Sequence, residues 1–484
     1  MSIRTLGMAL IALIAIAPAV SASESGPDRS KLPDPMGTTN WTPPEVQQWT
    51  LKNGLAVWLL EVHEAPLVSL RVVTTHGAAT DPVDKAGVAS LMVDMMDEGA
   101  GDRSALALSE AFQLLATDYG GQAYTDGLVF TLEMLADNVE ASLKLFSDVL
   151  LRPQFSQKEF ERRKAQRIAS ALAQEASPAY GATAVRRRVL FGTGYGGQLT
   201  GGVRQSLEGI TLDDLKGRYE GLVKPKGGTI IIVGDTTKTA INALLESTLG
   251  EWTGAPSLAV ASATPQSNLN AIYAVDYPGS AQSVISLARP TAGTDAEDLF
   301  ATLVFNKQFS GGFTGRVNMN LREDKGYTYG ARGGFERLQK AGSYKIGAKV
   351  KRDTTRKSLD EIIKELAWVS GDKPLTEKEL NAGKGGMIKS FPGRFERMSS
   401  VAGQLVRLVV DGYSPDWYAA WPKRVNEIDL ETARSAGTKY TDSTGFAIIV
   451  AGDLSKIGES LKGLGRPIKL FDAQGNALPE SSDK

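Results

Sequence analysis

The segment TIIIVGD at residues 229–235 is similar to a second segment, FAIIVAGD, at residues 446–453. Each copy is a short run rich in β-branched residues that ends in Gly-Asp, which is typical of a strand buried inside a sheet. Aligning Gly234 with Gly452 gives an offset of 218 residues. The chain therefore contains two candidate core strands, one in each half.

Two further landmarks repeat at nearly the same distance. Leu212 and Leu430, each opening the helix expected before its strand, are again 218 residues apart. Upstream, QKEF at residues 157–160 resembles EKEL at residues 377–380, at an offset of 220 residues. Three landmarks in one order at almost one spacing indicate an internal duplication. The alternative is a chance match between β-rich segments.

The two halves show the same coarse order of strands and helices. This order predicts an α+β fold made of two homologous α/β repeat domains, each a mixed sheet packed with helices. We expect the first domain over residues 46–253 and the second over residues 270–472. Residues 254–269, rich in Ala, Ser, Pro and Thr, are expected to link them, and residues 473–484 to form a tail.

Local patterns place the elements within each half. KNG at residues 52–54 is a turn signal inside a hairpin expected over residues 51–62. In the first half we expect strands at 68–75, 121–135 and 228–233, and helices at 85–98, 104–118, 139–151, 156–175 and 213–219. In the second half we expect strands at 282–288, 327–335 and 341–351, helices at 296–308, 355–370 and 376–391, and a loop at 310–313.

The N-terminus has the pattern of a secretory signal peptide over residues 1–22. Residues 8–20 are apolar, an early positive charge precedes them, and Val20-Ser21-Ala22 fits a cleavage site of small residues. A membrane anchor is the alternative, although the apolar run is shorter than the about 20 residues that a spanning helix needs. We therefore expect export, most simply to a bacterial periplasm, followed by a flexible segment at residues 23–45.

Composition excludes several classes of function. The chain has no Cys, so it has neither disulfides nor thiolate metal sites. Its net charge is −1, and it becomes −2 without residues 1–22, which contain Arg4 and no acid. This balance gives no electrostatic basis for binding nucleic acid or an anionic membrane.

Two local patterns resemble one family. GAATDP at residues 77–82 leads to GVA at residues 87–89 and into the helix expected next, and LREDKGYTY at residues 321–329 follows a Gly-rich segment. Together with the duplicated order, they resemble the pitrilysin/insulinase family of zinc peptidases over roughly residues 46–470. The family includes the mitochondrial processing peptidase and the core subunits of the respiratory cytochrome complex.

The resemblance implies that the zinc motif of this chain is degenerate. Catalytic members carry His-x-x-Glu-His directly after the first pattern, with two His as zinc ligands and Glu as general base. The matching positions here are Ser90, Val93 and Asp94. The third ligand, a Glu, is expected near Ala171, where the sequence has none. We therefore expect no metal or other cofactor on this chain.

Other residues were weighed as metal ligands. The two His, His63 and His76, lie at the ends of expected strands, where polar side chains are common. Asp94, Asp97 and Glu98 cluster at a helix end and could hold a hard cation weakly, but such clusters are more often solvated faces. Neither set replaces the missing zinc ligands.

The second pattern resembles the family signature of an Arg followed seven residues later by a Tyr, here Arg322 and Tyr329. In the family these side chains face the zinc and stabilise charge on the scissile carbonyl, which suits guanidinium and hydroxyl donors. The alternative is an Arg at a helix end and an ordinary strand Tyr. The preceding Gly311, Gly312 and Phe313 resemble a segment linked to substrate engagement, but the glycines could also make a turn.

This combination predicts a non-catalytic, substrate-binding subunit of an exported heterodimeric zinc metalloendopeptidase. The chain would supply Arg322 and Tyr329 in trans to a homologous partner that carries His-x-x-Glu-His and the zinc. Its ligand would be a peptide or unfolded polypeptide, with no nucleic acid and no membrane insertion. The alternative is a structural or peptide-binding family member without any part in proteolysis.

Overall fold

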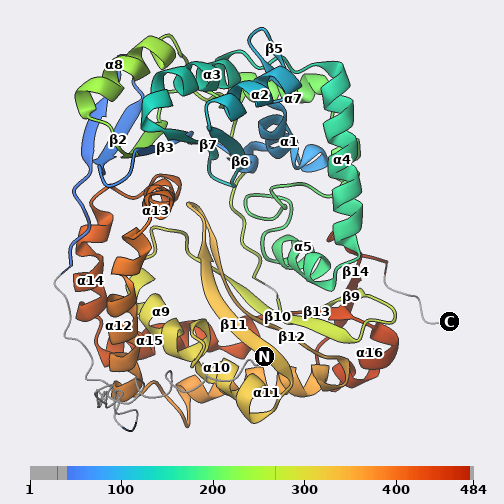
Figure 1. The fold of residues 1–484 in the computed structure, drawn as a ribbon. Coiled ribbons are helices and arrows are strands. Elements are labelled where there is room, and N and C mark those ends of the chain that lie inside the picture. The colour runs from blue at the N-terminus through green and yellow to red at the C-terminus, as the bar shows by residue number, and fades with distance from the viewer. Residues whose placement is uncertain (1–29, 31–40, 268, 480–484) are drawn as a thin grey trace, which may run out of the picture. The chain divides into compact units, whose positions relative to one another are not determined.

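Two six-stranded mixed sheets, which match in order and direction except at the outer strands β1 and β14, form the framework of the protein (Figure 1). The computed structural model describes Ser30, residues 41–267 and residues 269–479. All its helices and strands belong to one unit, residues 42–484. The expected signal peptide, most of the segment 23–45 and the last five residues of the tail lie outside the described residues.

The first sheet has the strand order β1-β2-β8-β3-β7-β6, and the second has β14-β9-β13-β10-β12-β11. In the first sheet β2 and β8 are parallel, and β3, β7 and β6 continue from β8 with each neighbouring pair antiparallel. In the second sheet β9 and β13 are parallel, and β10, β12 and β11 continue from β13 in the same antiparallel way. The bounds in the first sheet are β1 Gln47–Thr50, β2 Ala56–Glu61, β3 Leu67–Val73, β6 Asp118–Ala123, β7 Leu128–Leu135 and β8 Thr229–Gly234. In the second sheet they are β9 Ile272–Asp276, β10 Gln282–Thr291, β11 Thr328–Arg337, β12 Gly342–Lys351, β13 Ala447–Gly452 and β14 Ile468–Phe471.

The predicted duplication is confirmed by this correspondence. The repeated segments form β8 and β13, which occupy equivalent central positions and are buried along their whole length. Both strands end in a glycine, Gly234 and Gly452, because there is no room for a side chain at that position. Gly234 has φ +148°, and a Cβ there would lie 2.2 Å from the Leu67 carbonyl oxygen of β3. A Cβ on Gly452 would lie 2.6 Å from the Ser283 hydroxyl of β10, so both central strands need a residue without a side chain at this crossing.

Helices pack against both sheets. Those of the first half are α1 Val88–Met95, α2 Ala105–Leu114, α3 Val139–Leu151, α4 Gln157–Glu175, α5 Pro178–Phe191, α6 Arg204–Glu208, α7 Leu212–Leu222 and α8 Lys238–Leu249. Those of the second half are α9 Leu299–Asn306, α10 Arg316–Asn318, α11 Thr355–Ser370, α12 Glu377–Ser390, α13 Met398–Asp411, α14 Trp417–Glu427, α15 Leu430–Thr441 and α16 Leu454–Lys462. In the described residues, no helix is long and apolar enough to cross a membrane.

The structure differs from the sequence expectations in extent more than in kind. The helix expected at 85–98 is α1, which spans only Val88–Met95 because residues 83–85 form a separate 3₁₀ turn. The expected loop at 310–313 is partly helical, because α9 continues as a π-helical turn over Lys307–Gly311. A second π-helical turn spans Met319–Asp324 after α10. Helices α5, α8, α13 and α14 fall in segments for which no element was predicted from the sequence.

Contacts across the two halves position the sites. Helix α13 of the second half packs against β3 and β8 of the first sheet (Figure 1). The turn between β11 and β12 is bound to the first half, since the Gln339 amide donates to Asp126 (3.1 Å) and the Lys340 amide donates to the Tyr195 hydroxyl (3.2 Å). Tyr195 in turn donates to Asp126 at 2.5 Å. No helix or strand lies in the described part of 254–269, and the Ser262 carbonyl accepts from the Tyr195 amide.

Candidate functional site

Helix α1 carries the three positions that correspond to the zinc motif. It begins after Gly87, which has φ +95° and where a Cβ would lie 2.7 Å from the Gly201 carbonyl oxygen. The Asp81 carboxylate accepts from the Gly87 amide at 2.9 Å and so satisfies a free donor at the helix start. Burial nevertheless raises the pKa of Asp81 to about 7. The hydrogen bond from Gly87 to Asp81 fixes how α1 follows the segment at residues 77–82.

Arg167 of α4 contacts two of the three motif positions. Its Nε lies 2.7 Å from the Asp94 carboxylate, and its terminal nitrogen donates to the Ser90 hydroxyl. The guanidinium thus bridges the positions at which catalytic members carry two histidines, one helical turn apart. An arginine is permanently charged and cannot act as a metal ligand. A guanidinium cation therefore contacts the two positions whose histidines hold zinc in catalytic members of the resembled family.

Val93, the position of the general base, is sealed from solvent. It is 2% exposed, and its Cγ1 lies 2.4 Å from where a Cβ on Gly121 of β6 would be. The edge strand β6 therefore packs directly onto this valine, whose hydrocarbon side chain cannot accept a proton from a water. Ala171, near which the third ligand was expected, is also buried in the first hydrophobic core.

Two more arginines of α4 neutralise the end of α1. Glu98, 6% exposed, forms ion pairs with both Arg162 and Arg163. Two of the three carboxylates of the possible weak cation site, Asp94 and Glu98, are therefore paired with guanidinium groups. Among the described residues, no group of three or more His, Asp or Glu side chains is arranged to hold a metal ion.

A small open cavity remains beside the degenerate motif. It measures about 410 Å³, and its lining includes Asp94, Asp97, Tyr119, Arg163 and Arg167. Burial, reinforced by the nearby Glu98, raises the pKa of Asp97 to about 6. Burial also raises the pKa of Asp94, and Arg167 opposes that effect. The Tyr119 hydroxyl is buried without a hydrogen-bond partner in the described structure.

The two histidines lie apart from this cavity's lining. His63 Nδ1 is 2.7 Å from Asp235, and its Nε2 is 3.5 Å from Glu61, at the exposed ends of β8 and β2. Hydrogen bonding to Asp235 raises the pKa of His63. His76 hydrogen-bonds the hydroxyl of its neighbour Thr75. These contacts are those of polar strand-end residues.

Arg322 and Tyr329 flank one turn at the edge of the second sheet. Arg322 belongs to the π-helical turn Met319–Asp324, and the Tyr327 amide closes the connection by donating to the Leu321 carbonyl at 2.9 Å. Tyr329 follows on β11, where the pairing with β12 shifts register between Thr328 and Ala331. Such a bulge re-aims side chains, and Tyr329 is 91% exposed.

Phe313 connects this turn to the Gly-rich segment. The guanidinium of Arg322 lies 4.6 Å from the centre of the Phe313 ring, and that of Arg332 lies 5.8 Å from it. Arg332 also donates to the Gly312 carbonyl at 3.0 Å. The half-exposed Phe313 is therefore held between two cations next to Tyr329's strand.

The two glycines of the segment pack against their own chain. A Cβ on Gly311 would lie 2.6 Å from the Asn306 amide nitrogen, and one on Gly312 would lie 2.7 Å from the Lys307 carbonyl oxygen. Both contacts belong to the wide turn that ends α9. This packing accounts for the glycines structurally, and a contact between them and substrate stays a prediction.

The sequence reasoning missed Arg167, the residue that defines the degenerate site. A signal was present, since Arg162, Arg163 and Arg167 recur at helical spacing while Asp94, Asp97 and Glu98 cluster at the end of α1 and just after it. Complementary charges on two elements indicate a pairing only when the elements are known to be neighbours. That adjacency of α1 and α4 is a tertiary contact.

Comparisons with family models and with known proteins point to the same family. The model described as insulinase (peptidase family M16) matches residues 57–195, and the one described as peptidase M16 inactive domain matches residues 209–387. The non-peptidase homologue YmxG of Helicobacter pylori is 24% identical over 349 residues, which is 70% of this chain and 78% of that protein. An uncharacterised zinc protease of Mycobacterium leprae is 19% identical, over 81% of this chain and 84% of that one.

Solved structures show the same fold. A peptidase M16 inactive domain from Pseudomonas fluorescens superposes with a TM-score of 0.78 and 26% identity, over 84% of this chain and 98% of that one. A protease from Helicobacter pylori superposes with a TM-score of 0.77 and 16% identity, over 85% and 100% of the two chains.

The chain belongs to the insulinase (M16) family of peptidases, as the resemblance of its two local patterns predicted. Within that family it is an inactive, pitrilysin-type member without the His-x-x-Glu-His motif. The expectation of a non-catalytic member with an α+β fold of two homologous domains is thereby confirmed.

Proposed function

We propose that this chain is the substrate-binding subunit of an exported heterodimeric zinc metalloendopeptidase. It contributes Arg322 and Tyr329 to the active site of a homologous partner that carries His-x-x-Glu-His and the zinc ion. The observation that carries the proposal is the exposure of Tyr329, at 91%, on a bulge of an edge strand. An aromatic side chain held out in this way has no packing role in its own domain.

The state of the two sites supports a division of labour. In the first half, Arg167 contacts Ser90 and Asp94, the positions at which catalytic members carry two histidines. Arg322 and Tyr329 lie in the other half and make few contacts within the chain. Arg322 forms an ion pair with Glu323 and stacks on the Phe313 ring. Guanidinium and phenol donors are suited to stabilising negative charge on a carbonyl oxygen of a bound peptide.

A peptide would bind by extending one of the sheets. Strands β6 and β11 occupy equivalent edges of the two sheets, each paired on one side only in the described structure. Strand β6 borders the cavity at the degenerate motif, and β11 carries Tyr329. Addition of an extended peptide to such an edge supplies main-chain hydrogen bonds independent of sequence, as a protease subunit with many substrates requires.

The test is turnover of the complex reconstituted with the zinc-bearing partner. Replacing Tyr329 by Phe removes the hydroxyl and keeps the ring, so assembly stays intact. Loss of one such donor lowers kcat by about 100-fold or more. Tyr327→Phe removes a tyrosine hydroxyl two residues earlier in the chain and serves as the matched control. Its turnover should equal that of the wild type.

The partner itself is identified by native co-purification from the host's exported fraction. A similar-sized protein with His-x-x-Glu-His at about one to one supports the proposal, and it also tests the export that the signal peptide predicts. Recovery of the chain without such a protein, or equal turnover of Tyr329→Phe and Tyr327→Phe complexes, would refute the assigned role. Either result favours a binding or structural member of the family.

A further inference from the structure

A second cavity, in the C-terminal half, is built from aromatic rings and arginines and is not used in the proposed function. It lies among α9, α12, α13, α14 and β11 and measures about 410 Å³. This volume falls within the about 300–1,000 Å³ typical of small-molecule sites. Its lining includes Leu303, Phe335, Met387, Trp417 and Trp421. The walls are therefore suited to an apolar, ring-containing ligand.

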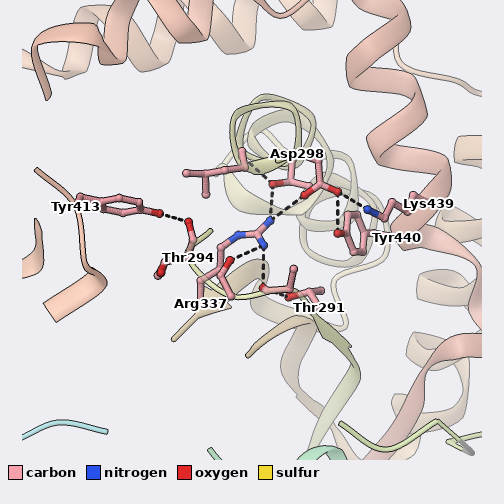
Figure 2. Close-up of polar contacts among 11 residues, drawn as sticks. Thr291, Thr294, Asp298, Arg337, Tyr413, Lys439 and Tyr440 are labelled. Atoms are coloured by element: carbon pink, nitrogen blue, oxygen red, sulfur yellow. Dashed lines mark hydrogen bonds and ion pairs between the residues drawn. The ribbon is translucent and has the colours of Figure 1, made fainter. Parts of the chain in front are cut away.

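Stacking holds the aromatic wall in place. The Phe391 and Trp421 rings are parallel at 4.5 Å between centres, and the Tyr413 and Trp417 rings stack at 4.8 Å. The Tyr413 hydroxyl donates to the Thr294 carbonyl at 2.6 Å, as Figure 2 shows. Preformed walls of this kind lose little conformational entropy when a ligand enters.

Arg337 provides a fixed donor within this cavity. Its side chain is 5% exposed, and Figure 2 shows its terminal nitrogens directed at Asp298 and at backbone carbonyl oxygen. One terminal nitrogen donates to the Ala292 carbonyl and the other to the Thr302 hydroxyl, each at 3.0 Å. These contacts use both ends of the guanidinium. Arg337 thereby holds this wall of the cavity in place, and its charge is balanced by Asp298 at 3.5 Å.

Arg394 adds a cation without a carboxylate partner among the described residues. Its guanidinium lies over Phe391 at 5.7 Å and over Trp421 at 5.4 Å, and the residue is exposed. The other two cations of the lining are paired, Arg407 with Asp411 at 3.0 Å and Arg337 with Asp298 at 3.5 Å. The free charge of the cavity is therefore positive. This excludes the quaternary ammonium ligands that aromatic boxes otherwise suit.

We propose that this cavity binds a small aromatic carboxylate. Its ring system lies between Trp417, Trp421 and the apolar wall, and its carboxylate pairs with Arg394. The site is separate from Arg322 and Tyr329, so the protein would carry a small-molecule site alongside its peptide-binding surface.

The test is calorimetric titration of the purified chain with 1-naphthoate as the probe and neutral 1-naphthylmethanol as its uncharged analogue. We expect one naphthoate per chain and binding of the alcohol weaker by about tenfold or more, because a charge-assisted contact is lost. Arg394→Gln should weaken naphthoate by a similar factor. Arg397→Gln removes an exposed arginine three residues away that is not in the lining and should leave binding unchanged.

A cavity-filling variant, Leu303→Trp, locates the site by abolishing naphthoate binding. The surface variants Arg394→Gln and Arg397→Gln keep the test valid if Leu303→Trp does not fold. Equal affinities for naphthoate and the alcohol, equal effects of the two arginine substitutions, or no saturable binding at all would overturn the proposal.

Discussion

Ser90 and Asp94 are one helical turn apart on α1, and the guanidinium of Arg167 reaches both side chains. At the residue scale this contact replaces the zinc site of the catalytic relatives. A guanidinium keeps its charge at every physiological pH and presents its donors in a fixed plane. It therefore holds α1 and α4 together without a metal. Asp97 lies nearby, and burial raises its pKa to about 6.

The contact between Arg167 and Asp94 should contribute to stability. In a double-mutant cycle with Arg167→Gln and Asp94→Asn, we expect a coupling free energy of about 1 kcal/mol, because the pair is about two-thirds buried. The measurement is urea unfolding. The exposed pair of Lys144 and Glu140, at 2.7 Å, is the control, and its coupling free energy should be clearly smaller because solvent screens it. Equal couplings would show that Arg167 is a surface residue like any other.

Asp97 should make the protein less stable as pH rises. Its folded-state pKa of about 6 is above the unfolded value of 3.8, so the folded chain binds the proton more tightly. Stability is therefore lost as pH increases from about 4 to about 6. Asp97→Asn should raise the unfolding free energy at pH 8 by about 1–2 kcal/mol and have little effect below pH 4.

The measurement is urea unfolding of wild type and Asp97→Asn across that pH range. Asp102→Asn, an exposed acid five residues on, is the matched control and should change the pH profile little. A difference between wild type and Asp97→Asn that is the same at pH 4 and pH 8 would contradict this account.

At the scale of elements, glycines decide how closely the repeated helices and strands approach. Helix α15 crosses α9 at Gly437, where a Cβ would lie 2.6 Å from the ring of Phe305. The bulge on β11 is a second local feature with a structural effect, because it turns Tyr329 outward at an edge strand. Neither feature is visible in hydrophobic periodicity, which predicted α11 and α3 to the residue and left the bulge unnoticed.

Gly437→Ala should destabilise the second domain. The added methyl group overlaps the buried Phe305 ring, and overpacking of this kind costs about 1–3 kcal/mol. Gly458→Ala on α16 is the control, because nothing lies within 4 Å of a Cβ there. That change should stabilise by about 0.5–1 kcal/mol through helix propensity. Thermal unfolding of both variants decides, and a gain in stability for both would show that α15 can shift away from α9.

At the scale of the whole molecule, buried polar contacts hold the two homologous halves in register. Asp126, 8% exposed, accepts from Tyr195 of the first half and from the Gln339 amide of the second. This contact fixes the turn that joins β11 to β12. The strand that carries Tyr329 is thereby tied to the half that contains the degenerate motif.

Tyr195→Phe should loosen this connection. The Lys340 amide donates to the Tyr195 hydroxyl, so its hydrogen exchange should become faster when the hydroxyl is removed. Tyr413→Phe also removes a buried hydroxyl bond, but to Thr294 within the second half, and should leave Lys340 unchanged. Hydrogen-exchange mass spectrometry over the β11–β12 turn measures both. Unaltered exchange in Tyr195→Phe would mean that the turn is held by other contacts.

The sequence by itself determined the duplication, the α+β class and the absence of the zinc motif. These follow from local patterns: buried strands of β-branched residues, a 218-residue offset and three substituted positions on one helix. Only the tertiary structure decided that Arg167 fills the degenerate site, that a bulge exposes Tyr329 and that Arg337 and Arg394 face an aromatic cavity. Each depends on residues far apart in the chain, whose adjacency is set by the packing of whole elements.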